Sequence, residues 1–396
     1  MLIIYQQGKV QEGDTIILST AYEMRNAEGG ELWFSFPVKY DKYLVTENAD
    51  AAVIGLLLLA MKNAENIEVE GSLSARLFYQ LNHYLIPALN LANSKWKPIS
   101  IEAKELNTNS LNQAGIAGTG LTCGVDSLAT VCDHLNELEP FDIRCFTFFN
   151  AGSHGNFGGD MARDVFKKRR RLVKRFSDEV GKDLLWVDSN INEILIMDHQ
   201  QTHTIRDAAC VLNLQKLFRY YYYASAYRFD YFKLNDRGTA DYDILLLSML
   251  STESTTFYSS AAQYTRVERT NLIVDYSPSY EYLNVCTRAS ATGEVENCST
   301  CNKCLRTQLT LESLQKLPLY EDVFDLRKYR RKRTNYIGRV LSERKSNMLS
   351  KEIYELMRQT RLQIPLLSYF YCLVWTIIRQ LRSLYKKYLG SQSRRR

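Results

Sequence analysis

Proline is scarce in this chain, with seven residues among 396, and no segment of low complexity is present. These absences argue against a proline-rich or otherwise biased, disordered chain. Hydrophobic residues make up 45% and charged residues 24% of the sequence, as in an ordinary soluble globular protein. A chain of this length predicts two or three domains.

A secretory pattern is also lacking. Residues 1–5 are not a basic segment followed by a long apolar stretch and a cleavage site, so we expect a cytoplasmic protein. Nine cysteines in a chain of this size do not form a disulfide scaffold, and four of them fall between residues 286 and 304. In a reducing compartment, such crowding indicates a metal site.

Charge is distributed unevenly. The net charge is +6, yet residues 311–396 hold 20 Lys and Arg against seven Asp and Glu. The body of the chain is therefore mildly acidic, and the C-terminal part is strongly basic.

Hydrophobic periodicity predicts a small N-terminal α/β unit over residues 1–109. The expected strands are 15–19, 31–36, 66–70 and 99–103, and the expected helices are 51–62 and 74–90. The apolar run 51–60 is too short to span a bilayer and is typical of a buried helix.

Strands and helices alternate in residues 110–312. The expected strands are 114–121, 143–149, 184–188 and 244–248, and the expected helices are 126–138, 160–180 and 208–227. This alternation predicts an α/β fold: a parallel sheet with helices on both faces, which binds ligands beyond the carboxyl ends of its strands. Residues 313–396 are expected to form a basic helical C-terminal region.

The turn between the first strand and helix of this second unit has the composition of a phosphate-binding loop. Small residues from Gly118 to Gly124 allow backbone N–H groups to approach an anion, and the following helix presents its positive end there. Thr122 and Ser127 offer hydroxyls, and Asp126 can cap the helix or hold Mg²⁺. The alternative is an ordinary strand-to-helix turn with a capping Asp.

This loop is neither a Walker A sequence, which needs Gly-Lys-Ser/Thr, nor a dinucleotide-binding G-x-G-x-x-G loop. It resembles the S-G-G-x-D-S signature of the PP-loop ATP pyrophosphatases, the adenine nucleotide α-hydrolase superfamily with its HUP-like fold. The matching residues are Thr122, Cys123, Gly124, Val125, Asp126 and Ser127. Cys123 departs from the family glycine, and a positive φ there would strain a cysteine.

The resemblance implies a reaction in which a carboxylate or carbonyl oxygen attacks the α-phosphorus of ATP and pyrophosphate leaves. The loop would bind ATP and stabilise charge on the departing pyrophosphate with Mg²⁺, and Asp126 and Ser127 would be the catalytic residues. A nitrogen or sulfur nucleophile then displaces AMP.

Four cysteines follow further along the chain with a C-x11-C-x2-C-x2-C spacing. Thiols spaced in this way can surround one tetrahedral Zn²⁺, and a site made only of protein ligands is structural. A [4Fe–4S] cluster is the main alternative, although the position of its next cysteine is occupied by Gln308. Unligated or redox-active thiols are a third interpretation. The four candidate ligands are Cys286, Cys298, Cys301 and Cys304.

Together, the loop and the cysteine cluster resemble those of 7-cyano-7-deazaguanine synthase and its relatives, over residues 114–312. That family turns a carboxylate into an amide and then a nitrile, which implies an AMP- and pyrophosphate-forming ligase with an acid substrate and a nitrogen donor. The stretch Phe149–His154 faintly echoes a family motif that carries an additional acidic residue.

Two further features carry predictions about binding. Arg206, near the start of a predicted helix, is a candidate phosphate contact, with a solvated loop as the alternative. Residues 362–378 are uncharged and are followed by Arg379, Arg382, Lys386 and Lys387. Such a helix can pack on its own protein, on a twin subunit in a homodimer, or peripherally on an anionic membrane. The basic run 327–333 has no nucleic-acid-binding module around it, so nucleic acid is not an expected partner.

Two other functions remain open from the sequence. One is RNA base thiolation by a PP-loop enzyme, which commonly uses a reactive cysteine pair or an iron–sulfur cluster. The other is a non-catalytic zinc- and nucleotide-binding module, and the substitution of Cys123 for the family glycine keeps it open.

Overall fold

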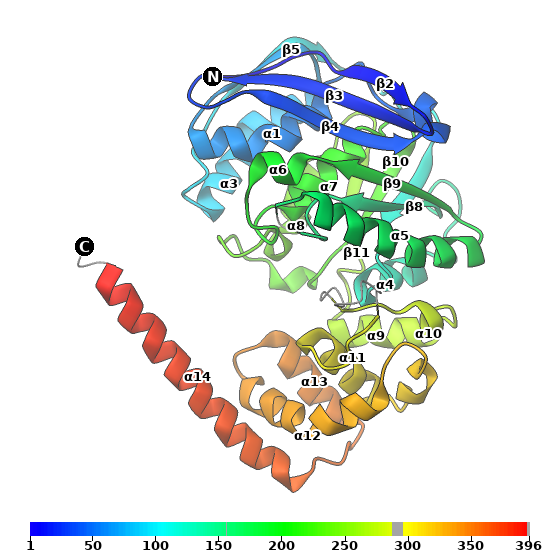
Figure 1. Cartoon of the computed structure of the whole chain (residues 1–396), viewed down its shortest axis with the longest axis vertical. Helices are drawn as coiled ribbons and strands as arrows, with labels where there is room; N and C mark the ends of the chain where they lie inside the picture. The colour runs from blue at the N-terminus through cyan, green and yellow to red at the C-terminus, as the bar shows by residue number, and fades with distance from the viewer. Residues whose placement is uncertain (156, 287–295, 394–396) are drawn as a thin grey trace. The chain divides into compact units, whose positions relative to one another are not determined.

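The computed structural model describes residues 1–155, 157–286 and 296–393 (Figure 1). The chain divides into two compact units. The first comprises Met1–Thr122 and Asp126–Gln263, and the second Cys123–Val125 and Tyr264–Arg396. These units do not follow the boundaries expected near residues 109 and 312.

The first unit is built on one continuous sheet of eleven strands in the order β11-β10-β7-β8-β9-β4-β3-β1-β5-β6, with β2 paired to β3. The strands are β1 (Leu2–Ile4), β2 (Gly8–Glu12), β3 (Thr15–Met24), β4 (Gly30–Pro37), β5 (Ile67–Ser74), β6 (Ile101–Asn107), β7 (Ile116–Gly120), β8 (Ile143–Asn150), β9 (Asp183–Ser189), β10 (Phe218–Ala224) and β11 (Thr256–Ser260). The expected N-terminal α/β unit is therefore an extension of the central sheet, joined where β4 pairs antiparallel with β9.

Strands β7 to β11 are parallel to one another, as the alternating pattern predicted. Their order reverses direction at β7, since β8 and β9 lie on one side of it and β10 and β11 on the other. Right-handed crossovers then put α4 and α5 on one face and α7 and α8 on the other. The point of reversal is where ligands of such sheets bind.

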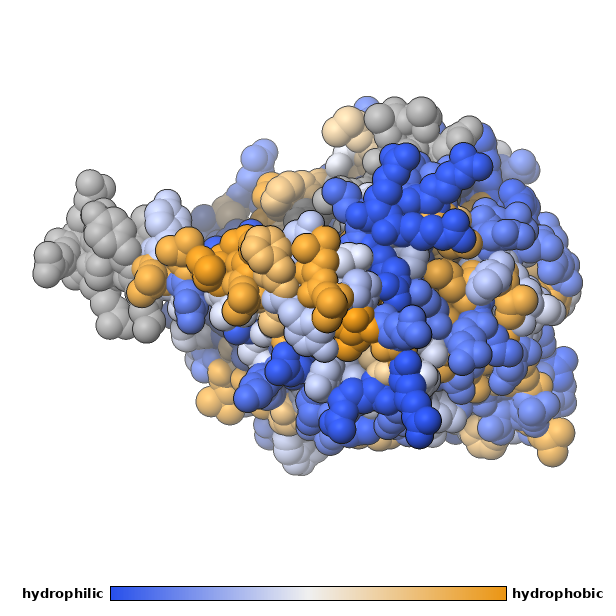
Figure 2. Space-filling model, turned by 90° about the horizontal axis from the view of Figure 1, so that it is seen from below, coloured by the Kyte–Doolittle hydropathy of each residue, from blue (hydrophilic) through white to orange (hydrophobic). Residues whose placement is uncertain are grey.

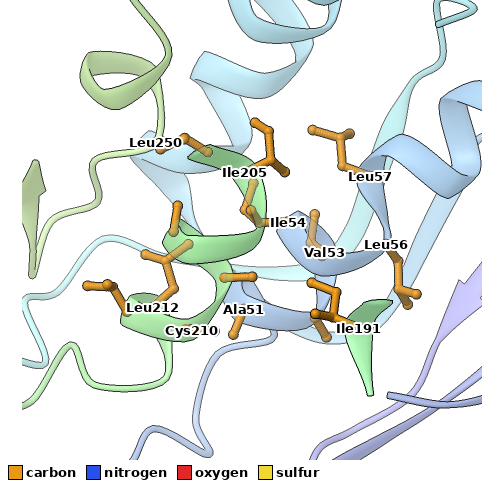
Figure 3. Packing of buried hydrophobic residues seen from close by; sticks show 14 of the residues in the cluster. Ala51, Val53, Ile54, Leu56, Leu57, Ile191, Ile205, Cys210, Leu212 and Leu250 are labelled. Atoms are coloured by element: carbon orange, nitrogen blue, oxygen red, sulfur yellow. The ribbon is translucent and has the colours of Figure 1, made fainter. Parts of the chain in front are cut away.

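The helices of the first unit connect and cover these strands. They are α1 (Asp50–Asn63), α2 (Ala75–Gln80), the π-helical turn η2 (Leu81–Leu85), α3 (Ile86–Ala92), α4 (Val125–Asp133), α5 (Asp160–Glu179), α6 (Ile191–Leu195), α7 (His203–Leu212) and α8 (Asp243–Met249), with short 3₁₀ turns η1 (Val38–Tyr43), η3 (Phe229–Tyr231) and η4 (Thr239–Asp241). Helix α1 is buried, as expected: Val53, Ile54 and Leu57 pack among Ile205 of α7 and other apolar residues (Figure 3).

Two sequence predictions in this unit are wrong. The expected helix over residues 208–227 ends at Leu212, and its second half is strand β10. The expected strand 244–248 lies inside helix α8, and the fifth parallel strand is instead β11. The remaining predicted strands and helices are present with shifted ends.

The second unit is helical in its described residues. Its elements are α9 (Arg266–Val274), α10 (Ser279–Tyr282), α11 (Asn302–Ser313), the 3₁₀ turn η5 (Leu317–Tyr320), α12 (Leu326–Glu343), α13 (Met348–Gln359) and α14 (Leu366–Ser393). The expected basic helical region therefore shares a unit with the cysteine cluster. No helix in the described part of the chain is long and apolar enough to cross a membrane.

Candidate functional site

The predicted phosphate loop connects β7 to α4, the strand and helix that the sequence assigned to it. The backbone N–H of Thr122 donates to Ser127 Oγ at 3.3 Å, and the two hydroxyl oxygens are also 3.3 Å apart. Thr122 is exposed, whereas Ser127 is 3% exposed. Hydrogen bonding between Thr122 and Ser127 thus joins the two ends of the loop.

Cys123 has a backbone conformation that favours glycine. Its φ is +55°, in the left-handed region, where a non-glycine residue is strained by about 1–2 kcal/mol. The thiol is fully buried, and burial raises its pKa well above the usual range. Cys123 is therefore a packed, protonated thiol.

Gly118, before the loop, has a packing role. Gly118 and Gly120 lie within β7 itself, and a Cβ at Gly118 would fall 2.3 Å from the ring of Phe218 on the neighbouring strand β10. The aromatic ring covers the strand only because no side chain is present there.

Cys123→Gly is expected to change the free energy of unfolding by less than about 1 kcal/mol, because relieved backbone strain offsets the lost packing of a thiol. Cys123→Val should destabilise by about 2 kcal/mol or more, since a β-branched residue at positive φ is a greater outlier. Urea unfolding measures both. At Cys210, which is buried in helix α7, glycine should instead destabilise the protein more than valine does. Greater destabilisation by Gly than by Val at position 123 would contradict this account of the loop.

A cavity of about 300 Å³ opens at the carboxyl ends of β7, β8 and β10. One wall is the loop, through Gly120, Leu121, Thr122, Asp126 and Ser127. The other walls come from four parts of the first unit. Strand β8 and its following turn contribute Thr147, Phe148, Phe149 and Ser153, and β10 and its following turn contribute Tyr221, Tyr223, Ala224 and Ala226. Helix α7 and the turn before it contribute His199, Gln200, His203 and Asp207, and η4 contributes Ala240. The cavity lies where the strand order reverses, as expected for a ligand site.

The α7 side of the cavity carries polar side chains whose protonation is set by burial. Tyr223 Oη lies 2.6 Å from His203 Nδ1. Burial lowers the pKa of His203 to about 3, with smaller contributions from His199 and Arg206. Burial also raises the pKa of Tyr223 well above its usual range. The imidazole is therefore neutral and the phenol protonated, so both can hydrogen-bond a ligand group.

Asp207 lies one turn further along α7. Burial raises the pKa of its carboxyl to about 7, and the charge of Arg206 opposes the shift only in part. A carboxyl group poised near neutral pH on a cavity wall suits proton exchange with a bound ligand.

Replacement of Asp207 by Asn should make the free energy of unfolding fall less as the pH rises. In the wild type, the folded state keeps a proton on Asp207 between about pH 4 and 7, whereas the unfolded state has lost it. The contribution of this group to stability is thus complete below about pH 4 and is lost as pH rises through about 7, with a slope of at most about 1.4 kcal/mol per pH unit.

Urea unfolding at pH 5 and pH 8 tests this expectation. The difference in unfolding free energy between Asp207→Asn and the wild type should shift in favour of the variant at pH 8. A difference that is equal at both pH values would mean that Asp207 does not titrate in this range.

Arg206 occupies a different position from the one expected. Its side chain is fully buried, with Nη1 donating to Asn192 Oδ1 at 2.6 Å and Nη2 to the carbonyl of Met197 at 2.8 Å. A Cβ at Gly152 would lie 2.7 Å from Nη1. Arg206 thus supports the turn after β8 and is not among the residues that line the cavity.

The four predicted metal ligands do come together, in the second unit. Their sulfur atoms all lie within 4.8 Å of one another. Individual Sγ separations are 4.0 Å for Cys286 and Cys301, 3.9 Å for Cys298 and Cys304, and 3.4 Å for Cys301 and Cys304. Sulfurs at about 2.3 Å from a central zinc ion are about 3.8 Å apart in a tetrahedron. The cluster can therefore hold a metal ion.

Asn297 fixes the two halves of this cluster to each other. Its Oδ1 accepts the N–H groups of Val285 (2.9 Å) and Cys286 (3.2 Å). Its Nδ2 donates to the carbonyls of Leu283 (2.7 Å) and Val323 (3.0 Å). The sequence alone did not single out Asn297, because an asparagine before a cysteine carries no distinctive signal.

Gln308, at the position of the missing iron–sulfur cysteine, is also part of this support. Its side-chain amide is buried in α11 and donates to the carbonyls of Ser299 (3.0 Å) and Cys304 (3.1 Å). This glutamine therefore holds the turn that carries the last three cysteines against the helix.

Backbone N–H groups also point at the sulfurs. The N–H of Cys301 donates to Cys298 Sγ at 3.3 Å, and that of Cys304 to Cys301 Sγ at 3.5 Å. The Sγ atoms of Cys301 and Cys304 lie within hydrogen-bonding distance, and this contact lowers the pKa of Cys301 and raises that of Cys304. Such N–H donors stabilise thiolates, which are the form that binds metals.

A scan against protein-family models gives no match, and a search of curated proteins finds no significantly similar sequence. Assignment of a function therefore depends on the residues and the geometry described above.

The cavity contains four residues that the sequence did not identify as a group: His199, His203, Asp207 and Tyr223. The first three come from α7 or the turn before it, and Tyr223 comes from β10. With residues 208–227 predicted as a single helix, Tyr223 could not be placed on a strand beside β7. A correct prediction of strand β10 would have placed Tyr223 at the same end of the sheet as the other three residues.

Proposed function

We propose that this chain is a PP-loop-type enzyme that binds ATP at the β7–α4 loop and adenylates a carboxylate or carbonyl oxygen with release of pyrophosphate. A nitrogen nucleophile then displaces AMP, as in the 7-cyano-7-deazaguanine synthases that the sequence resembles. The observation that carries the proposal is the cavity at the reversal point of the parallel sheet, with Thr122, Asp126 and Ser127 on its wall.

The loop residues are suited to the pyrophosphate end of the nucleotide. The N–H groups at the start of α4 and the hydroxyls of Thr122 and Ser127 would bind phosphate oxygens. Asp126, on the cavity wall in the first turn of α4, would hold Mg²⁺, which neutralises charge on the leaving pyrophosphate when bound.

The opposite wall is suited to the acid substrate. His203 and Tyr223 offer uncharged hydrogen-bonding groups, and Asp207 has a pKa of about 7. In this proposal, Asp207 takes a proton from the attacking nitrogen nucleophile, because a base with a pKa near the working pH is the most effective.

For the cysteine cluster we propose zinc in a structural role. Four cysteine ligands leave no open coordination position, and the support from Asn297 and Gln308 favours a fixed site. An iron–sulfur cluster would make the purified protein brown, whereas a zinc protein is colourless.

Analysis of the nucleotide products tests the proposed reaction. The protein is incubated with ATP labelled on the α-phosphorus, Mg²⁺, an ammonium salt and a panel of aromatic and heterocyclic carboxylic acids. AMP and pyrophosphate should form in equal amounts and only with a productive acid. Formation of ADP and phosphate instead would contradict the proposed mechanism.

A further inference from the structure

Helix α14 is attached to the second unit by one face only. A Cβ at Gly338 of α12 would lie 2.4 Å from Cβ of Tyr371, so the glycine allows the two helices to pack closely. The Trp375 indole donates to Asn335 at 3.2 Å, and the Arg379 guanidinium donates to the carbonyl of Ser342 at 2.7 Å.

The opposite face of α14 is apolar and exposed. Six residues at helical spacings of three and four form this stripe: Leu366, Phe370, Leu373, Ile377, Leu381 and Leu384. Each is more than half exposed, with Leu366 at 88% and Leu373 at 65%. Figure 2 shows hydrophobic residues gathered in a band on this face, with hydrophilic residues along both sides. A continuous apolar stripe of this length on a surface marks an interaction site.

The charged residues of α14 and of the segment before it have one sign. After Glu355 the chain contains nine Lys and Arg and no Asp or Glu. Helix α12, on which α14 packs, adds five exposed basic residues: Arg327, Lys328, Arg330, Arg331 and Lys332. The surface that accepts this helix must therefore carry negative charge.

A second copy of the chain fits this pattern poorly. Pairing two α14 helices would bring together identical basic segments without an acidic residue to neutralise them. The heptad pattern also fails at Gln380 and Lys387, which replace apolar residues two and three heptads after Leu366.

A lipid surface fits both features. Aliphatic residues can enter the boundary between headgroups and acyl chains, Tyr369 and Tyr385 suit the interface, and basic residues bind anionic headgroups. We propose that the exposed face of α14 lies on a membrane surface that contains anionic phospholipids, with α12 fixing which face is presented. The helix lies in the plane of the interface, because none of the described helices can cross a bilayer.

Vesicle co-sedimentation of the full chain tests this proposal. Wild-type protein should bind phosphatidylcholine vesicles that contain phosphatidylserine, bind pure phosphatidylcholine vesicles much less, and lose binding at high salt. The double variant Leu373→Glu, Ile377→Glu should bind at least about tenfold more weakly, since two charges then enter the apolar stripe.

The control is Leu138→Glu, Met161→Glu. Both residues are more than 80% exposed and lie in the first unit, so this variant adds the same charge and should bind as the wild type does. Equal binding by the α14 variant and the wild type would overturn the proposal, as would binding without dependence on phosphatidylserine. A wild-type oligomer that the α14 variant converts to a monomer, without vesicle binding, would assign the stripe to a second copy and also overturn it.

Discussion

Asp126→Asn is expected to lower pyrophosphate formation by about 10²–10³-fold, because the variant loses the carboxylate proposed to hold Mg²⁺ at the leaving pyrophosphate. The substitution keeps the size of the side chain and its position in the first turn of α4. Binding of a Mg²⁺ complex of a non-hydrolysable ATP analogue should weaken by about tenfold, which corresponds to about 1.4 kcal/mol.

The matched control is Asp133→Asn on the same helix. Asp133 is the last residue of α4, accepts a hydrogen bond from Gln263 at 2.8 Å and does not line the cavity. Its replacement should leave nucleotide binding and turnover unchanged. If both variants behave alike, or if Asp126→Asn retains full activity, the loop has no part in the reaction.

Cys304→Ala is expected to remove the bound metal and to destabilise the second unit by on the order of 4 kcal/mol, because metal binding and folding of a four-cysteine site are coupled. For a unit of this size the melting temperature should fall by roughly 10 °C. Metal analysis by mass spectrometry and thermal unfolding measure the two effects on the same samples.

Cys132→Ala is the control for this experiment. Cys132 lies on α4 and is not one of the clustered thiols, so the variant should retain one zinc ion per chain and lose little stability. A wild-type protein that contains no metal, with a melting temperature unaffected by strong chelators, would show that the cluster is not a metal site.

The sequence predicted the parts of the fold that have a strong local signal. Strand β7, its loop and α4 were placed correctly because small residues, an acidic residue suited to a first helical turn and an amphipathic helix follow one another directly. The four cysteines were grouped by spacing alone, and the structure brings their sulfur atoms together.

The errors occurred where the hydrophobic residues of an element follow one another without a clear period. The run Tyr220–Tyr223 of β10 consists of four consecutive tyrosines, so it lacks the alternation of polar and apolar residues that identifies a half-exposed strand. No glycine or proline separates it from α7, and the helical pattern was extended through it. The apolar run at the start of α8 is short enough to fit either a strand or a helix.

Long-range side-chain contacts could not be predicted from the sequence for a different reason. A basic residue at a helix start, such as Arg206, has the same local signal whether it faces a ligand or a buried asparagine. Only the packing of α6 and α7 decides that its guanidinium donates to Asn192. The same packing brings Asp207 to the cavity wall.

A crystal structure with Mg²⁺ and an ATP analogue that carries a methylene bridge between the α- and β-phosphorus tests the central claim most directly. The account predicts the β- and γ-phosphates against the N–H groups and hydroxyls of Thr122–Ser127, Mg²⁺ on Asp126 and the α-phosphorus facing the wall that carries His203 and Asp207. A triphosphate bound elsewhere, with this loop free of phosphate, would contradict it.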